Sequence, residues 1–241
     1  DLRPALARAQ GTWNRCAAAR RVRRWAAARG ALLLALAGVV ATSFACPDGF
    51  GTVGIVGTGI QARLQLEYLN TLKGPVEASV WGRSDAAVEQ YVGDMQRLGV
   101  SVQPCDTVQA LCAASRTLIT TTPSTEPLVK SAWVQPGTHI TAIGADAEGK
   151  QELDTALFAR ARGVLVDSRE QCVDHAEVCH AVNAGVVSEQ DLIEIGAAIA
   201  GTPWQLRPDG DVTIADLSGL GASDAMMAQS ILLAADVALD S

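Results

Sequence analysis

The sequence predicts an α/β protein with a doubly wound parallel sheet, and three observations support this prediction. Short apolar runs alternate with helix-like segments along residues 52–216, and most of these runs lack polar alternation, as expected for strands buried on both faces. Hydrophobic residues make up 49% of the chain but aromatic residues only 4%, so the core must be built from Ala, Val, Leu and Ile. A glycine-rich turn follows the first apolar run.

That turn lies in residues 52–62, T-V-G-I-V-G-T-G-I-Q-A. Its glycines would let the backbone turn tightly and approach a pyrophosphate, and the N-terminus of the next helix would offer free N–H groups. The following helix and strand complete a βαβ unit of about 30 residues, which favours a Rossmann-type turn over a glycine turn that binds nothing. The residues expected at the pyrophosphate are Gly57, Thr58, Gly59, Ile60, Gln61 and Ala62.

The remaining elements follow in regular order. Strands are predicted at residues 52–56, 76–81, 100–103, 117–121, 139–143, 163–166 and 210–216. Helices are predicted at residues 60–72, 85–98, 107–114, 154–160, 170–184, 189–200 and 221–239.

The predicted helix at residues 170–184 places Cys172, His175 and Cys179 on one face, with His180 adjacent. Zinc uses such ligands, but structural zinc usually pairs closely spaced cysteines, and Cys also fits a buried helix face as a small hydrophobic residue. No metal site is therefore predicted.

Residues 1–46 differ in composition from the rest, being rich in Arg and Ala. The basic residues 20–24 precede an apolar run at residues 31–41, which imitates a secretory signal. The run is too short to span a bilayer, which needs ~20 apolar residues, and it leads directly into the glycine turn. We favour an Ala-rich helix packed beside the nucleotide domain, or an incomplete N-terminal region, in a cytoplasmic protein without a membrane partner.

Charge and cysteine usage narrow the function classes. The formal net charge is −7, which argues against a general nucleic-acid binder, because such proteins are usually basic. The six cysteines contain no C-x-x-C pair, and a chain of 241 residues does not need disulfides to hold its core. They are interpreted as reduced thiols of a cytosolic protein.

The end of the second strand bears on the choice of dinucleotide. An NAD site would need a carboxylate there to bind the ribose 2′-OH, but the sequence reads W-G-R-S-D at residues 81–85. Arg83 and Ser84 suit a 2′-phosphate, while Asp85 fits better as a helix N-cap. NADP(H) is favoured, with NAD(H) as the alternative; Arg83 could also be a solvated surface residue.

Polar residues follow the later strands, and ligands of open α/β sheets bind at such strand ends. Thr121, Thr122 and Ser124 would face the cofactor, although Thr-Pro also simply makes a turn. Asp146 lies in a glycine-flanked loop four residues before Lys150, a pair that suits acid/base chemistry or forms only a surface salt bridge.

Two further stretches have the same ambiguity. Asp167 either faces the cleft or caps the next helix. Residues 216–224, D-L-S-G-L-G-A-S-D, either let the backbone approach a ligand or form an ordinary connection.

Together these motifs resemble the ornithine cyclodeaminase/mu-crystallin family. The resemblance covers roughly residues 50–241 and rests on five stretches, of which the third is the most specific: V-G-I-V-G-T-G-I-Q-A-R (53–63), T-T-T-P-S-T-E-P-L (120–128), I-G-A-D-A-E-G-K-Q-E-L (143–153), V-D-S-R-E-Q-C (166–172) and D-L-S-G-L-G-A-S-D (216–224). Within the family the chain looks most like the ectoine-utilisation member.

The resemblance implies a Rossmann domain inserted in a substrate-binding, dimerising domain that is built from both chain ends. Residues 1–50 would be an atypical remnant of that second domain, residues 51–210 the NAD(P)-binding domain, and residues 211–241 a strand and helix that return to the second domain. It also implies a homodimer that acts on a small α-amino or imino acid, by cyclodeamination of ornithine or by reduction of cyclic ketimines.

The resemblance also implies roles for particular residues. Asp146 would be the catalytic carboxylate with Lys150 as its neighbour, Asp167 would lie beyond the cofactor cleft, and Ser218 and Gly219 would approach the nicotinamide. Family members carry a longer region before the glycine turn, and residues 1–51 lack its L-T-x-x-R-T-like signature, so no substrate-clamp residue is predicted.

The alternatives to an enzyme acting on amino or imino acids are a non-catalytic NADP(H)-binding protein of mu-crystallin type, a fragment that binds cofactor without turnover, and an ordinary dehydrogenase.

Overall fold

The computed structural model describes residues 17–219, with side chains from residue 31 onward except that of Lys73. The chain divides into two compact units, and the sheet and its surroundings belong to the unit of residues 34–220. The helix predicted at residues 221–239 lies outside the described residues.

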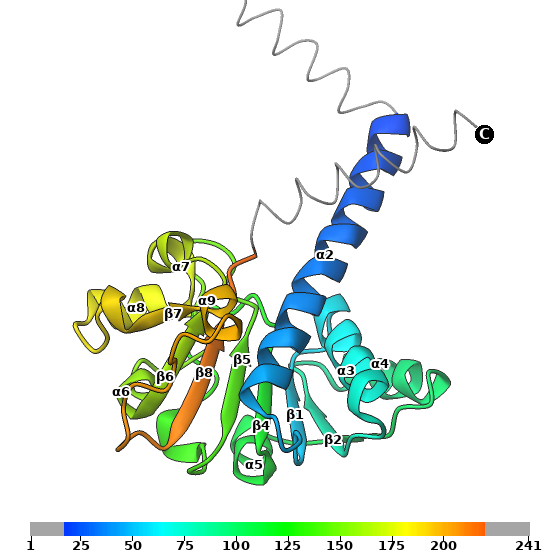
Figure 1. Ribbon diagram of the computed structural model, residues 1–241. Helices are drawn as coiled ribbons and strands as arrows, with labels where there is room; N and C mark the ends of the chain where they lie inside the picture. The colour runs from blue at the N-terminus through cyan, green and yellow to red at the C-terminus, as the bar shows by residue number, and fades with distance from the viewer. Residues whose placement is uncertain (1–16, 220–241) are drawn as a thin grey trace, which may run out of the picture. The chain divides into compact units, whose positions relative to one another are not determined.

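Among the described residues, eight parallel strands form one sheet in the order β3-β2-β1-β4-β5-β8-β6-β7 (Figure 1). This confirms the predicted α/β fold with a doubly wound parallel sheet. The strands are β1 (Val53–Val56), β2 (Ala78–Trp81), β3 (Val102–Pro104), β4 (Thr117–Thr120), β5 (His139–Ala142), β6 (Ala161–Val166), β7 (Leu192–Glu194) and β8 (Val212–Asp216).

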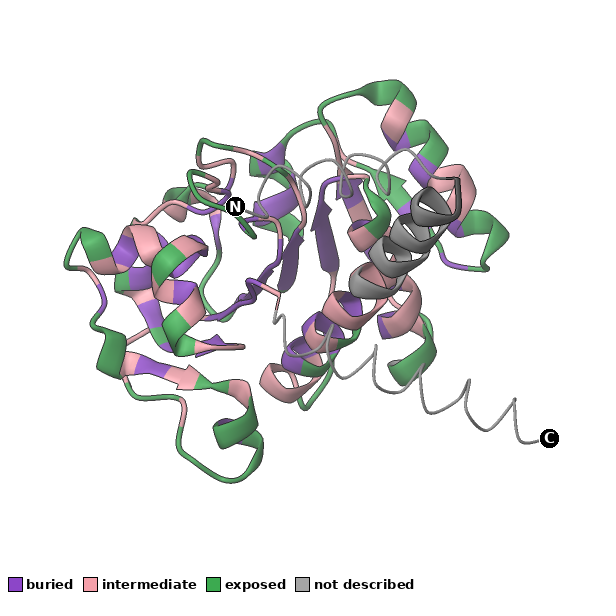
Figure 2. Cartoon of the chain, turned by 90° about the horizontal axis from the view of Figure 1, so that it is seen from above, coloured by how far each residue is buried: buried purple, intermediate pink, exposed green. Residues whose placement is uncertain are grey.

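Helices cover both faces of the sheet, and successive residues of a strand pack into different hydrophobic clusters. Ile55 packs with α3 and α4, whereas its neighbour Val56 packs in the cluster that includes residues of α5, α6 and α8. The strands are therefore buried in the centre, while the outer helix faces remain exposed (Figure 2). The helices are α2 (Ala17–Ala45), α3 (Ile60–Lys73), α4 (Asp85–Arg97), α5 (Val108–Ala114), α6 (Ala156–Arg160), α7 (Arg169–His175), α8 (Glu177–Asn183) and α9 (Ile195–Ile199), with short 3-10 turns η1 (Ser131–Trp133) and η2 (Glu189–Asp191).

The single helix predicted at residues 189–200 is wrong. A capping box between Ser188 and Asp191 supports only the turn η2, after which β7 pairs in parallel with Val164–Val166 of β6. The helix α9 begins only at Ile195. Pairing with the sheet edge satisfies the backbone of β6 and buries Leu192, and this outweighs the helical pattern of the local sequence.

The helix predicted at residues 170–184 is also wrong as one continuous element. It breaks at Ala176, whose backbone is extended, and α8 begins afterwards. The carboxylate of Asp216 accepts a hydrogen bond from the N–H of Val178 at 2.7 Å, so the break gives α8 its own N-terminal partner. Cys172 and Cys179 consequently lie on two different helices.

The strand predicted at residues 210–216 forms, but its place differs from the expectation. β8 lies between β5 and β6, where His139 pairs with Thr213 and Val164 pairs with Ile214. Ile214 and Ala215 are fully buried, which suits a central strand and not a departure from the sheet. The expectation that the chain leaves the nucleotide-binding sheet at residue 211 is therefore wrong for this strand.

Residues 34–45 of α2 pack against the sheet, as predicted for an Ala-rich helix beside the nucleotide domain. Val39 and Ala41 are buried, and the hydroxyl of Thr42 lies 2.7 Å from that of Thr141 in β5. No helix formed by the described residues combines the length and apolarity needed to cross a bilayer.

Candidate functional site

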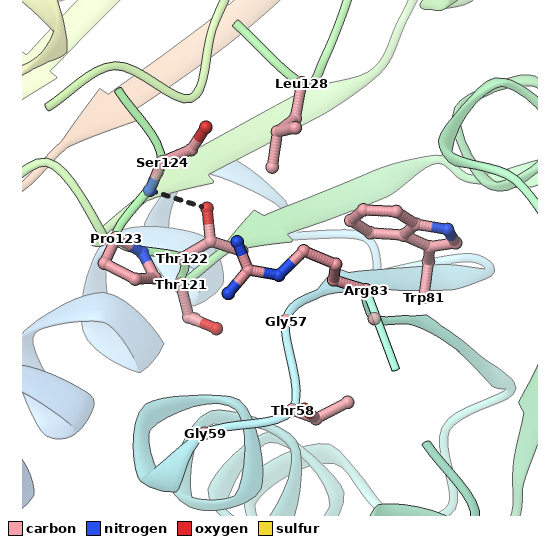
Figure 3. A pocket seen from close by; sticks show the side chains of 11 residues that line it. Gly57, Thr58, Gly59, Trp81, Arg83, Thr121, Thr122, Pro123, Ser124 and Leu128 are labelled. Atoms are coloured by element: carbon pink, nitrogen blue, oxygen red, sulfur yellow. Dashed lines mark hydrogen bonds between the residues drawn. The ribbon is translucent and has the colours of Figure 1, made fainter. Parts of the chain in front are cut away.

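A pocket of about 260 Å³ opens at the carboxyl ends of β1, β2 and β4 (Figure 3). β2 and β4 flank β1 on opposite sides, so the chain connections diverge here and leave the crevice in which ligands of open α/β sheets bind. The described residues that line it are Gly57, Thr58, Gly59, Trp81, Gly82, Arg83, Thr121, Thr122, Pro123, Ser124 and Leu128.

The glycine turn forms the floor of this pocket. Gly57 has a φ of +118°, and a Cβ atom there would lie 2.5 Å from the Thr121 hydroxyl oxygen, so no larger residue fits without strain. Gly59 occupies the N-cap of α3 without a side-chain hydrogen bond to the helix. The first turn of α3 therefore presents backbone N–H groups and the positive end of the helix dipole beside the pocket.

Three of the six residues predicted at the pyrophosphate, Gly57, Thr58 and Gly59, line the pocket. Ile60 and Gln61 begin α3 outside the lining, with the Ile60 side chain exposed. Ala62 is fully buried, and its carbonyl accepts a hydrogen bond from the Tyr91 hydroxyl at 2.9 Å. Alanine at the third small position of the G-x-G-x-x-A pattern therefore permits close packing of α3, as this pattern requires.

Arg63 of α3, which was not among the predicted site residues, stabilises the glycine turn. Arg63 donates to the carbonyl of Thr58 and forms an ion pair with Asp94 of α4 at 2.6 Å. Its guanidinium also lies 5.2 Å from the centre of the Tyr91 ring. The hydrogen bond from Arg63 lowers the pKa of Asp94, so the pair stays ionised. Arg63 thus stabilises the turn and is already engaged by other groups.

The end of β2 supplies the only cation among the residues lining the described pocket. Arg83 is exposed and extends over the opening toward the segment 121–124 (Figure 3). Ser84 caps α4, since its hydroxyl accepts from the N–H of Ala87, and it does not line the pocket. The N-cap role predicted for Asp85 is therefore wrong: Asp85 is the first helical residue.

The segment after β4 forms the opposite wall, and it contains the three predicted hydroxyl residues, Thr121, Thr122 and Ser124. The Thr121 hydroxyl donates to the carbonyl of Val56 at 3.3 Å, and the Ser124 hydroxyl donates to the carbonyl of Glu126 at 2.7 Å. The Thr121 bond ties the wall to β1, and the Ser124 bond holds the wall segment's own turn, so the turn and the wall form one preorganised surface.

Asp146 and Lys150 form a salt bridge in the loop after β5. Neither lines the pocket, and both side chains are partly exposed. The ring nitrogen Nε2 of His180 lies 2.8 Å from the carbonyl oxygen of Lys150, which ties this loop to α8. The surface salt bridge that was the alternative interpretation of this pair is present. A role of Asp146 and Lys150 in acid/base chemistry remains a proposal.

Three buried carboxylates near these loops were missed by sequence reasoning: Glu152, Glu177 and Asp216. Burial raises the pKa of Glu152 and of Asp216 to about 7, against hydrogen bonds from Thr122 and from Val178 that lower it. Burial and the charges of Asp216 and Glu152 also raise the pKa of Glu177. Asp216 is the last residue of β8, so the strand-end rule applied to Asp167 could have found it.

Asp167 lies at the end of β6 and binds the start of the last described segment. Its carboxylate accepts from the N–H of Ser218 at 3.3 Å, from the Ser218 hydroxyl at 3.2 Å and from the N–H of Gly219 at 2.9 Å. The thiol of Cys172 also donates to it. Ser168 caps α7, so the capping alternative for Asp167 is wrong, and Asp167, Ser218 and Gly219 lie outside the pocket lining.

Cys172, His175 and Cys179 do not share one helix face, because the break at Ala176 leaves the first two on α7 and puts Cys179 on α8. Burial strongly raises the pKa of the Cys172 thiol, which disfavours the thiolate that a metal would need. Within the described residues, no three His, Cys, Asp or Glu side chains group closely enough to hold a metal ion.

Comparison with known proteins agrees with this architecture. A putative dehydrogenase of Rhizobium meliloti is 38% identical over 197 residues, which cover 80% of this chain and 59% of that protein. The structure of an archaeal alanine dehydrogenase dimer with bound NAD is 34% identical with a TM-score of 0.76, covering 83% of this chain and 62% of that one. The iminosuccinate reductase of Paracoccus denitrificans in complex with NAD⁺ is 32% identical with a TM-score of 0.74, covering 85% and 64%.

The chain spans about three fifths of the length of curated relatives that it matches. The family model described as "Ornithine cyclodeaminase/mu-crystallin family" matches residues 27–235. With the sheet order and the glycine turn in place, the chain belongs to the ornithine cyclodeaminase/mu-crystallin family.

Proposed function

We propose that this chain binds NADP(H) in the pocket between β1, β2 and β4, and that it acts as an NAD(P)-dependent enzyme on an α-amino or cyclic imino acid. The observation that carries the proposal is the pocket itself. It combines a glycine turn at a helix N-terminus, no lining carboxylate among the described residues and one exposed arginine at its rim.

The pyrophosphate would lie against the turn of residues 57–59. Gly57 leaves room for it, and the N–H groups at the start of α3 would donate to its oxygens. The partly buried indole of Trp81 and the side chain of Leu128 offer an apolar surface for the adenine. The adenosine end of the dinucleotide therefore belongs at β2.

Arg83 supports the choice of NADP(H) over NAD(H). A carboxylate at this position would bind a ribose 2′-OH and repel a 2′-phosphate, whereas a guanidinium can bind the phosphate with two hydrogen bonds. The two similar structures named above contain NAD or NAD⁺, so the proposed preference for NADP(H) is supported by Arg83 alone and requires its own test.

The reaction would take place on the β5 side of the pocket. A bound nicotinamide supplies a hydride acceptor or donor. Asp146 and Lys150 are the chain's candidates for moving a proton to or from the substrate nitrogen or an attacking water, because their salt bridge keeps a carboxylate and an ammonium together at a strand end. Asp167 would hold Ser218 and Gly219 where the nicotinamide approaches.

This assignment covers two reactions of one substrate class, reduction of a ketimine and cyclodeamination of a diamino acid such as ornithine. The names of the related alanine dehydrogenase and iminosuccinate reductase support an amino- or imino-acid substrate. The archaeal relative is a dimer, which supports a homodimer here as well.

A second function, NADP(H) binding without turnover, is favoured by a different observation. Asp146 and Lys150, the candidates for proton transfer, do not line the pocket and are paired with each other. Cofactor binding would use the lining residues between 57 and 128, which do not depend on that pair.

One set of assays separates the two functions. The full chain is incubated with NADPH or NADH and Δ1-pyrroline-2-carboxylate or pyruvate with ammonia, and separately with NAD⁺ and ornithine. Asp146→Ala should reduce turnover at least about 100-fold, as expected when a proton-transferring group is removed. Asp209→Ala, an exposed aspartate in the loop before β8, should leave turnover unchanged. Nucleotide binding without turnover on any substrate would support the second function and contradict the first.

A further inference from the structure

The carboxylate of Glu152 joins the two loops that follow β4 and β5. Its Oε1 atom accepts a hydrogen bond from the N–H of Thr122 at 2.5 Å, and its Oε2 atom accepts from the N–H of Gly144 at 2.9 Å. Thr122 is part of the pocket wall, and Gly144 begins the loop that carries Asp146 and Lys150. One fully buried side chain therefore spans from the cofactor pocket to the candidate catalytic loop.

The loop after β5 is closely fitted to this carboxylate. A Cβ atom at Gly144 would lie 2.3 Å from Oε2 of Glu152 and 2.2 Å from the carbonyl oxygen of Thr122. Any residue other than glycine would force the carboxylate or the pocket wall to move. The fit shows that Thr122, Gly144 and Glu152 are positioned as one unit.

The backbone of Glu152 is held just as closely as its side chain. The carboxylate of Glu177 accepts from the N–H groups of Glu152 at 2.5 Å and Leu153 at 2.9 Å. The carbonyl of Glu152 accepts from the N–H of Leu128 at 2.8 Å, and Leu128 also lines the pocket. Glu152 thus contacts the pocket wall twice, through its side chain at Thr122 and through its backbone at Leu128.

We propose that Glu152 is a positioning residue, which holds the Thr122 wall of the cofactor pocket at a fixed spacing from the Asp146–Lys150 loop. It would control dinucleotide affinity and turnover without lining the pocket itself. This inference rests on the proposed function for its consequences in binding, whereas the hydrogen-bonded unit can be tested without any ligand.

The acid–base state of Glu152 should affect this unit. Burial raises the pKa of Glu152 to about 7. When ionised, it accepts both N–H groups, whereas a protonated carboxyl presents a hydroxyl to one of them. Other acids face the same region: Glu177 from α8, Asp216 from β8 and Asp167 from β6, and their charges act on one another. The positively charged Lys150 is paired with Asp146. We expect the two loops to be held more firmly above pH 7 than below it.

The variant Glu152→Gln tests the proposal with little change in volume. Glutamine has a single acceptor oxygen, so one of the two N–H groups must face an NH₂ group. We expect NADPH, titrated by fluorescence into the full chain at pH 8, to bind at least about tenfold more weakly, because one buried donor is left unsatisfied. The wild type should bind NADPH more weakly at pH 6 than at pH 8. The variant should lose the part of this difference that exceeds the ionisation of the nucleotide's own 2′-phosphate, whose second pKa is about 6.

Glu89→Gln is the matched control, because Glu89 is exposed on α4 and carries the same charge. It should bind NADPH as the wild type does at both pH values. Glu152→Gln binding within twofold of the wild type at pH 8, with the pH difference retained, would overturn the proposal.

A measurement on the wild type covers the case in which Glu152→Gln does not fold. The backbone amide resonances of Thr122 and Gly144, followed by NMR between pH 5 and 9, should shift together with one midpoint near pH 7. Independent midpoints, or no shift in either amide, would overturn the shared carboxylate. This result does not depend on any nucleotide, so absence of NADPH binding with a joint titration would contradict the proposed function and leave the positioning role of Glu152 in place.

Discussion

The two halves of the sheet's carboxyl edge carry opposite chemistry. At β1, β2 and β4 the described pocket is lined by glycines, hydroxyls and one arginine, without any carboxylate. At β5, β6 and β8 the corresponding edge carries buried acids, namely Glu152, Glu177 and Asp216, together with Asp167. The first half offers N–H donors to a ligand, while the second half uses its acids to bind N–H groups of the protein itself.

This difference predicts the direction in which the proposed dinucleotide would bind. Phosphates are stabilised where N–H groups and Arg83 point outward, and they would meet like charges among the acids of the other half. In the proposed complex the phosphates and the adenosine would therefore lie near β1 and β2, and the nicotinamide would lie nearest to β5 and the Asp146 loop. The acids would contribute by fixing loops, as Glu152 does for Thr122 and Gly144.

The largest effect is expected when the first half loses its open turn. Gly57→Ala should weaken NADPH binding at least about 100-fold, because the new methyl group meets the Thr121 hydroxyl oxygen at 2.5 Å in a backbone of positive φ. Gly93→Ala is the control, since a Cβ atom there in α4 meets nothing within 4 Å. Calorimetric titration of both variants would decide, and undiminished binding by Gly57→Ala would place the nucleotide elsewhere.

A smaller effect on NADPH binding is expected when Arg83, at the rim of the same half, is replaced. Arg83→Ala should weaken NADPH binding about tenfold and leave NADH binding nearly unchanged, because only NADPH carries the 2′-phosphate that a guanidinium would bind. Arg162→Ala, an exposed arginine at the start of β6, should change neither affinity. Equal losses of affinity for both nucleotides would show that Arg83 does not bind the 2′-phosphate.

The buried acids of the second half should make the stability of the folded protein depend on pH. Burial raises the pKa of Asp216 to about 7, above the value of about 3.9 expected in the unfolded chain. The folded protein then binds the proton more tightly, so this stabilisation is complete below about pH 4 and is lost as the pH rises through 7.

The melting temperature should consequently fall by several degrees between pH 5 and pH 8, and Asp216→Asn should flatten that slope. The asparagine oxygen can still accept from the N–H of Val178. Thermal unfolding at four pH values measures the slope, with Asp209→Asn as the exposed control. An unchanged slope in Asp216→Asn would mean that Asp216 is ionised in the folded protein throughout this range.

The same contrast explains what could be predicted from the sequence. The glycine turn and Arg83 are local signals, because the positions of a βα turn and of a strand end follow from a few consecutive residues. Trp81 and Leu128 line the pocket only because β2 and the segment after β4 meet there, which depends on distant chain segments. Local reasoning could not bring them together.

The acids were missed for a related reason. Glu152 and Glu177 look like ordinary surface residues in a polar loop and on a short helix. Their roles arise from burial against distant backbone, since Glu152 accepts from the N–H groups of Thr122 and Gly144 and Glu177 accepts from that of Glu152. The order of the strands was equally non-local: β8 fills the place between β5 and β6 although it comes last among the described strands. The local helical pattern at residues 189–200 yielded to strand pairing with β6.

The central claim is that the half of the edge formed by β1, β2 and β4 binds a dinucleotide, and direct titration of the wild type tests it. Trp81 lines the pocket, so energy transfer from tryptophan to a reduced nicotinamide should report binding. We predict saturable binding of NADPH at one site per chain, tighter than that of NADH. Absence of saturable binding for both nucleotides, in a chain shown to be folded by its thermal transition, would contradict the account.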